Sequence, residues 1–279
     1  MEKVDVKEEV KTTKCLNCDT EFQGKFCPNC GQKADTGRFT ISFIFTNLIQ
    51  GILSNDGGVW FTLKNLFTRP GAMMVDIING KRKSYFSPFP MLFLTLAFYV
   101  MIFSFTGSKV GNNAFVQTES EVTVDVTAED DMSVAFKTET DKLLQRIYHF
   151  YINHYTTSFV LTIPLYLVLA RLCYGKANRK RYNWGEYSIP IVYSLIMMVL
   201  YQSLTSIAYY FSTELSGFME RIATYINIII FTVCFKKMLG FSVVKTAWRS
   251  ILLIVSYWIT VILLAVVGTI LYVVIHLAS

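Results

Sequence analysis

Long apolar segments without acidic residues alternate with short charged segments along this chain. The apolar segments able to cross a membrane cover residues 84–108, 156–174, 187–213, 222–235 and 250–279. A helix needs about 20 apolar residues to cross roughly 30 Å of hydrocarbon. The first, third and fifth segments meet this length, and the second does so if the Arg171 side chain extends to the interface. The pattern therefore predicts an all-α polytopic membrane protein with about five transmembrane helices.

The fourth segment, 222–235, is shorter than a full crossing, and taken alone it fits a re-entrant hairpin as well as a span. Arg221 before it, and Lys236 and Lys237 after it, can reach the headgroups along their apolar stems. We therefore expect a span packed inside the bundle. Its single amide, Asn227, is expected to hydrogen-bond a neighbouring helix instead of facing lipid.

Charge placement predicts the orientation. Lys and Arg gather before the first span, after the second and after the fourth, whereas the loop at 106–157 carries four basic and eight acidic residues. Cytoplasmic loops carry the excess of Lys and Arg. The chain is therefore expected to be a multi-pass protein of the cell (inner) membrane, with a cytoplasmic N-terminus and a C-terminus outside.

The residues ahead of the first span, 39–83, are expected to form cytoplasmic interfacial helices. Apolar residues recur at helical spacing across 39–55, which predicts an amphipathic helix, with a sixth span as the alternative. A second short helix is expected at 59–68. In the outer loop, alternation at 116–126 predicts a strand or hairpin, and a disordered acidic loop is the alternative.

Four cysteines near the N-terminus have the spacing of a metal site. Cys15, Cys18, Cys27 and Cys30 form C-x2-C-x8-C-x2-C, followed by Gly31. Two such knuckles complete a tetrahedral site of four sulfurs, which suits Zn2+, and no position is left open for a catalytic water. We therefore expect a structural zinc ribbon at 15–38, covered by Phe22 and Phe26. The alternatives are two disulfides, against which a cytoplasmic location argues, and a redox C-x-x-C motif, which usually has one cysteine pair within a βαβ unit and not two pairs this close.

Composition narrows the function classes. The chain is 53% hydrophobic and 16% charged, against about 25% charged in an average soluble domain. The mixed-charge stretch at 1–14 is expected to be a disordered tail, and 84–279 a transmembrane domain with its outer loop at 106–157. Basic and acidic residues nearly balance around the ribbon, which lacks the basic stripe expected of a nucleic-acid surface. A cytoplasmic protein partner, besides membrane lipids, is the expected contact.

A second motif, R-P-G-x8-G-K-R-x2-Y-x2-P, runs from Arg69 to Pro88. Pro70 can start a short helix and Gly80 can end it. Ordinary positive-inside anchoring explains most of the motif. The alternative is a surface for anionic lipid headgroups or a partner. Its candidate residues are Arg69, Lys81, Arg82, Lys83 and Tyr85.

The ribbon followed by this motif resembles a bacterial family of membrane proteins of unknown function. The resemblance covers about residues 15–105 and implies a bacterial cytoplasmic-membrane location, but no activity. No Asp, Glu or Lys lies inside any span, which argues against ion-coupled transport, and no convergent catalytic set is visible. The sequence favours a non-enzymatic adaptor or scaffold, and a transporter or handler of a lipid or small molecule is the alternative. The third span repeats a tyrosine every eight residues, with other polar residues nearby, which favours hydrogen bonds between helices, and a polar cavity is the alternative. These residues are Tyr193, Tyr201 and Tyr209, with Gln202, Ser203 and Ser206.

Overall fold

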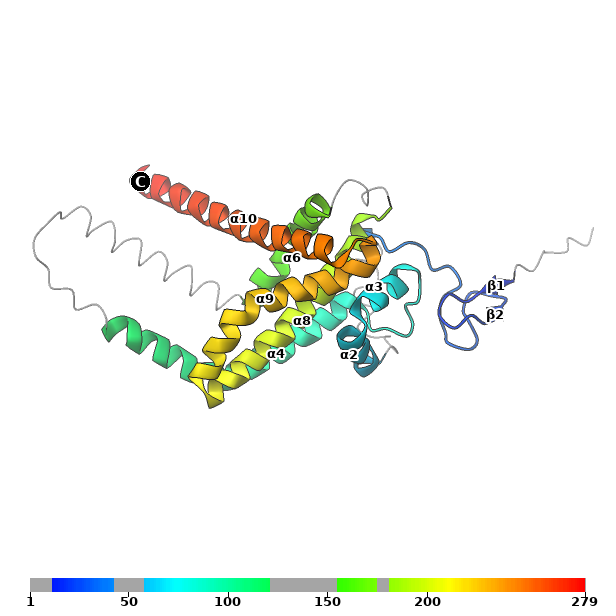
Figure 1. Cartoon of the computed structure of the whole chain (residues 1–279), viewed down its shortest axis with the longest axis horizontal. Helices are drawn as coiled ribbons and strands as arrows, with labels where there is room; N and C mark the ends of the chain where they lie inside the picture. Colours follow the sequence, from blue (N-terminus) through cyan, green and yellow to red (C-terminus); the bar gives the residue numbers. More distant parts are fainter. Residues whose placement is uncertain (1–11, 43–57, 121–154, 175–180, 279) are drawn as a thin grey trace, which may run out of the picture.

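A computed structural model describes residues 12–42, 58–120, 155–174 and 181–278 of the chain, and the side chains within them except those of 107–120, 155–161 and 265–278. It consists of a helical bundle with a small cysteine-rich ribbon at one end (Figure 1). Residues 1–11 of the tail expected at 1–14 and most of the amphipathic segment at 39–55 lie outside the described residues. Thr13 and Lys14 form a strand, so the ribbon begins two residues before Cys15.

The bundle is made of long apolar helices. They are α4 (Pro88–Ser120), α6 (Tyr155–Cys173), α8 (Trp184–Phe211), α9 (Thr213–Leu239) and α10 (Val243–Ala278). Within the described residues, four helices are long and apolar enough to cross a membrane, in α4, α8, α9 and α10. The described apolar part of α6, Thr162–Cys173, is shorter. The chain is therefore a predominantly helical protein with the apolar helices of a membrane protein.

Helix α8 is the centre of the bundle and packs against α4, α9 and α6. Its first half is buried on all sides, from Gly185 to Ile196. The helix begins with a capping box, in which Asn183 accepts from the Glu186 amide and Glu186 accepts from the Asn183 amide. These two bonds satisfy amide groups that a helix start leaves without intrahelical partners. Local sequence thus fixes where the central helix starts.

Helix α9 corrects the expectation of a short fourth segment. It has 27 residues, from Thr213 to Leu239, and continues through the charged residues on both sides of 222–235. Charges at the ends of a helix do not interrupt it, because their side chains reach away from the apolar part. Counting only uncharged residues therefore underestimated its length.

Two short helices connect the ribbon to the bundle. Helix α2 (Val59–Thr68) has the bounds that the sequence predicts, and α3 (Pro70–Ile78) begins at Pro70. The expected strand at 116–126 is wrong in its first half, because α4 continues to Ser120. The remainder of 116–126 lies outside the described residues. Long helices here extend beyond the apolar stretch that first marks them.

The Lys- and Arg-rich segments gather at the ribbon end of the bundle. Arg249 donates to the Tyr174 carbonyl, and Tyr182 donates to the Met238 carbonyl. Helix α3 packs on the C-terminal part of α9. The first bond joins the start of α10 to the residue after α6, and the second joins the residue Tyr182 ahead of α8 to the end of α9. The described residues next to the basic segments therefore lie at one end of the molecule, as the sequence argument for orientation requires.

Candidate metal centre and its attachment to the bundle

The four cysteines of the ribbon converge on one point. The ligand atoms of Cys15, Cys18, Cys27 and Cys30 all lie within 4.8 Å of one another. The Sγ atoms of Cys15 and Cys30 are 3.5 Å apart, and so are those of Cys18 and Cys27. A disulfide needs a sulfur–sulfur distance of about 2.05 Å. All four thiols are free, so the geometry fits a site for one metal ion and does not fit two disulfides.

Backbone turns bring the thiols together. The Asp19 amide donates to the Cys15 carbonyl in the first knuckle, and the Gly31 amide donates to the Cys27 carbonyl in the second. Gly31 has a φ of +71°, a left-handed conformation that glycine adopts without steric strain. Strands β1 (Thr13–Lys14) and β2 (Glu21–Phe22) pair antiparallel beside the first knuckle. The spacing of the cysteines and these short turns are sufficient to build the site.

The two aromatic residues expected to cover the ribbon behave differently. Phe22 is buried and packs with Cys15 and Cys27. Phe26 is 62% exposed. The expectation was wrong for Phe26, because a module with two short strands has an interior large enough for one ring.

The thiols differ in their readiness to lose a proton. Hydrogen bonds from the Thr20 hydroxyl and backbone lower the pKa of Cys18 to about 6. Desolvation raises the pKa of Cys30 to about 12. Cys18 is therefore the more readily ionised of the two thiols, and a bound cation would favour the loss of the Cys30 proton.

The donor set fits a soft tetrahedral metal ion. In a tetrahedron with metal–sulfur bonds of about 2.3 Å, sulfurs lie about 3.8 Å apart, close to the spacing of these thiols. The backbone amide of Asn17 also donates to the Cys15 sulfur at 3.4 Å, as backbone amides do around metal thiolates. Four sulfurs complete the coordination shell, so the site can hold a metal for structure and leaves no position for substrate.

The ribbon is bound to the R-P-G…G-K-R motif through residues next to its cysteines. Gln32 donates to the Gly80 carbonyl at 2.9 Å, and its oxygen accepts from the amides of Arg82 and Lys83. Gln32 is buried, at 4% exposure. Asn17 lies between the first two cysteines and accepts from the amide and hydroxyl of Ser84. Both knuckles therefore hold residues 80–84, which we call the 80–84 turn.

The glycine of G-K-R has a steric reason to be there. Gly80 has a φ of +101°, a conformation that side chains disfavour. A Cβ at Gly80 would also lie 2.6 Å from the Cδ1 of Leu16, in the first knuckle. The turn conformation and the close approach of the ribbon both require glycine here.

A second attachment joins the end of the ribbon to α8. Arg38 donates from Nε and Nη2 to the two carboxylate oxygens of Glu186, at 2.9 and 2.6 Å. This ion pair raises the pKa of the Arg38 guanidinium. Glu186 is buried and belongs to the capping box of α8. The same carboxylate thus starts the central helix and holds the chain leaving the ribbon.

The motif's arginine and tyrosine form a polar network over α2 and α3. Arg69 donates to the Asn65 side-chain oxygen and to the Tyr85 hydroxyl, and Tyr85 donates to Asp76 at 2.9 Å. Asn65 and Tyr85 are buried. The network connects the two short helices to the residues just before α4, so these motif residues have internal partners.

The candidate surface residues differ in exposure. Lys81 is exposed, and Arg69 has half of its side chain exposed. Arg82 and Lys83 are partly buried, Arg82 donates to the Gly37 carbonyl at 2.7 Å, and desolvation lowers the Arg82 pKa. A lipid or partner surface at Arg69, Lys81, Arg82, Lys83 and Tyr85 stays a prediction.

Sequence reasoning missed the residues that attach the ribbon. Asn17, Gln32 and Glu186 are polar residues in ordinary positions, and their partners are far away in the chain. One signal was available: Asn183 and Glu186 have the spacing of a capping box ahead of an apolar helix. The sequence around Arg38 gives no indication that Arg38 pairs with Glu186, which lies 148 residues later.

Comparison with known proteins gives one family. Residues 56–100 match the family model described as "Protein of unknown function (DUF3667)". The match covers α2, α3, the 80–84 turn and the start of α4, and the ribbon lies outside it. No curated protein and no solved structure matches the chain. Similarity to a family of unknown function is thus established for the motif region, and it carries no activity.

Proposed function

We propose that this chain is a non-enzymatic membrane adaptor whose cytoplasmic ribbon, held by structural Zn2+, binds a protein partner while the bundle anchors it. One observation carries the proposal: the ribbon is fixed to the bundle through Asn17 and Gln32 and presents an exposed aromatic residue, Phe26. Aromatic residues on rigid supports dominate the binding energy of many protein interfaces.

Zinc is the ion that the donor chemistry favours. Four thiolates select a soft ion, and the tetrahedral arrangement of two knuckles is typical of structural zinc. The chelated ribbon would keep Asn17 and Gln32 in position for the 80–84 turn. Metal analysis of the purified chain is expected to find one zinc per chain.

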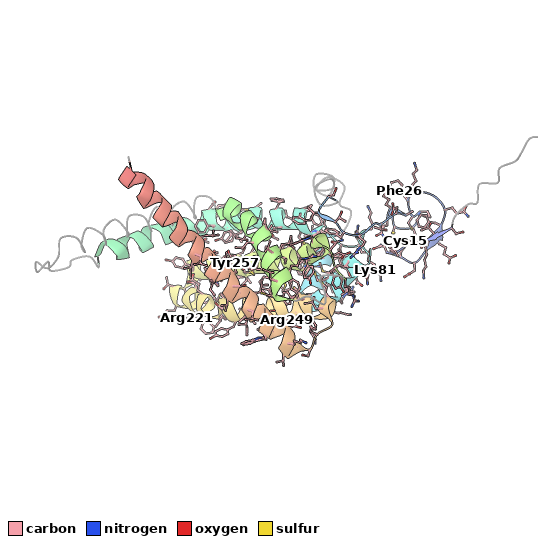
Figure 2. The ribbon with its side chains drawn as sticks, turned by 90° about the horizontal axis from the view of Figure 1, so that it is seen from above. Cys15, Phe26, Lys81, Arg221, Arg249 and Tyr257 are labelled. Carbon is pink, nitrogen blue, oxygen red and sulfur yellow. The ribbon has the colours of Figure 1, made fainter. Side chains whose placement is uncertain are left out.

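In the orientation that we propose, the chain crosses the membrane five times, with the ribbon in the cytoplasm and the C-terminus outside. The clustering of basic segments at the ribbon end supports it. Lys81 lies on the ribbon side of the bundle and Arg221 at the far end (Figure 2). The first residues of α9, at this far end, include Glu214 and Glu220, both exposed.

Two single cysteines test the orientation. Thr213 and Val244 are exposed at opposite ends of the bundle. In intact cells, Thr213→Cys is expected to react with an impermeant thiol reagent, and Val244→Cys to react only after the membrane is permeabilised. The reverse labelling would overturn the orientation.

Affinity purification in mild detergent tests the adaptor. A cytoplasmic protein is expected to co-purify with the full chain and to be lost with Phe26→Ala. The matched control is Phe67→Ala, because Phe67 is 59% exposed but lies on α2. Equal recovery of partners from the Phe26 and Phe67 variants, or recovery of no partner at all, would refute the proposal.

A further inference from the structure

The bundle encloses a cavity between α6, α8, α9 and α10, far from the ribbon. Its volume is about 220 Å³. The residues that matter for its chemistry are Tyr166, Tyr201, Gln202, Asn227, Tyr257 and Trp258. They lie near the middle of their helices, and Tyr257 is seen at mid-length of the bundle in Figure 2. The cavity therefore opens at the depth of the bilayer interior.

The side-chain amides of Gln202 and Asn227 line this cavity. Among the residues that the structure describes, neither the Gln202 nor the Asn227 side chain makes a hydrogen bond to another side chain or to the backbone. The expected hydrogen bond from Asn227 to a neighbouring helix is not seen among these residues and stays a prediction. An amide in an apolar environment without a partner costs a few kcal/mol. Each amide offers both donors and an acceptor to whatever occupies the cavity.

Aromatic rings also line the cavity, and their contacts hold them in position. Tyr166 stacks on Tyr257 with ring centres 4.3 Å apart and planes 7° apart. Tyr201 donates to the Met219 carbonyl at 2.6 Å, which fixes its ring between α8 and α9. A flat ring entering the cavity would therefore meet aromatic faces already in place, at a small cost in side-chain entropy.

The lining selects against charged ligands. No Asp, Glu, Lys, Arg or His is among the described residues that line the cavity. A charged group at this depth without a counter-charge would be strongly disfavoured. Trp258 lines the cavity and is 57% exposed, so the cavity reaches the outer surface of the bundle. The ligand is therefore uncharged and enters from the lipid phase.

We propose that the cavity binds the head group of an uncharged, lipid-soluble ring compound whose oxygen atoms hydrogen-bond to Gln202 and Asn227, as a quinone ring does. The space suits one substituted ring and is smaller than the 300–1,000 Å³ usual for a whole drug-sized ligand. An attached apolar tail would leave past Trp258 into the bilayer. The site is independent of the ribbon, so this proposal and the adaptor proposal can fail separately.

Quenching of Trp258 fluorescence tests the proposal. In the full chain with Trp60, Trp184 and Trp248 changed to Phe, Trp258 is the remaining tryptophan. The probe is decyl-benzoquinone, added to the protein in lipid nanodiscs. Saturable quenching is expected, beyond the linear quenching that partition into lipid causes. Decanol, which has the tail but no ring, is expected not to displace the probe.

Two variants report on the hydrogen bonds. Asn227→Leu and Gln202→Leu are each expected to weaken binding about tenfold, the upper range for one neutral hydrogen bond. Thr224→Leu is the matched control, because Thr224 is an exposed polar residue on the same helix as Asn227. It is expected to bind as the parent does, and like thermal midpoints in all variants exclude unfolding as the cause.

Three results would overturn the inference. Linear quenching in every variant would mean partition into lipid only. Displacement by decanol would mean a site for acyl chains and not for rings. Saturable binding that neither amide substitution weakens would remove Gln202 and Asn227 from the site.

Discussion

The ribbon end and the bundle core are held together by different kinds of contact. At the ribbon end, a few polar side chains make directional bonds across long sequence distances, such as Gln32 to the 80–84 turn and Arg38 to Glu186. In the core, rings stack and most hydroxyls bond within their own helix, as Ser203 does to the Val199 carbonyl. Tyr174 with Ser250 is an exception that joins two helices.

The difference follows from the surroundings of each region. A polar side chain inside an apolar bundle finds its nearest acceptor on its own helix, and packing joins one helix to the next. At the ribbon end, which is closer to water, a small number of hydrogen-bonded pairs determine how the ribbon is attached. Substitutions at the ribbon end should therefore detach the ribbon and leave the bundle folded. Substitutions at a helix–helix contact should affect the whole bundle.

Loss of the metal is expected to give the largest effect. Cys27→Ser with Cys30→Ser, or a chelator, should release the ion and unfold the ribbon, because a module this small has little core of its own. Hydrogen exchange should then become fast in residues 13–36 and in the 80–84 turn. The amides of α8 should keep their protection. Metal retained in the double variant would refute the assignment of the four cysteines as ligands. An equal loss of protection in α8 would show that the ribbon and the bundle do not unfold separately.

Gly71→Ala is expected to have the second largest effect, because Gly71 lies where α3 packs against α9. A Cβ at Gly71 would lie 2.8 Å from the Val233 carbonyl oxygen and 3.1 Å from the Lys237 Cβ. Helix α3 must then move away from α9, at a cost of about 1–3 kcal/mol. The thermal midpoint in detergent measures it. Gly217→Ala is the control, because its nearest neighbour is a flexible Arg221 end at 3.7 Å. A midpoint as high as that of the parent would contradict the close contact.

The sequence predicts the parts of this structure that depend on local pattern. The C-x2-C pairs identify the four thiols that converge, and Pro70 and Gly80 mark the ends of α3. Apolar runs locate the long helices. Their ends were misjudged where charged residues continue a helix, as in α9, because hydropathy reports the surroundings of a residue and not its backbone.

The parts that could not be predicted depend on contacts between distant residues. Nothing near Gln32 indicates that its amide will bind the backbone of residues 80–83, some 50 positions later. The exposure of Phe26 depends on how little interior the ribbon has. The cavity beside Asn227 exists because four helices leave space between them. The hydrophobic pattern of a single helix contains no information about a space between four helices.

Glu186→Ala is expected to have a moderate effect at the ribbon end. It removes both bonds to Arg38 and one half of the capping box. Loss of a helix cap costs about 1 kcal/mol, and the segment after the ribbon should exchange faster near residues 37–40. Glu214→Ala is the control, since Glu214 is an exposed acid in the first turn of α9. Equal behaviour of the two variants in exchange and thermal midpoint would count against the ion pair as an attachment.

Asn17→Ala is expected to have the smallest effect and gives the sharpest comparison. Asn17 and Asn29 occupy the same place in the two knuckles, directly before Cys18 and Cys30. Asn17 accepts from the amide and hydroxyl of Ser84, whereas Asn29 bonds only Thr20 within the described part of the chain. Asn17→Ala should therefore speed exchange of the Ser84 amide, and Asn29→Ala should leave it unchanged.

Zinc content separates the two possible causes of faster exchange. Neither asparagine side chain is a metal ligand, so both variants should keep the metal of the parent chain. Gln32 still holds the neighbouring amides of Arg82 and Lys83, so the change should stay local to Ser84. Metal loss in Asn17→Ala would mean that Asn17 supports the first knuckle itself. Faster exchange in both variants alike would mean that the ribbon is attached through its overall shape, and not through this side chain.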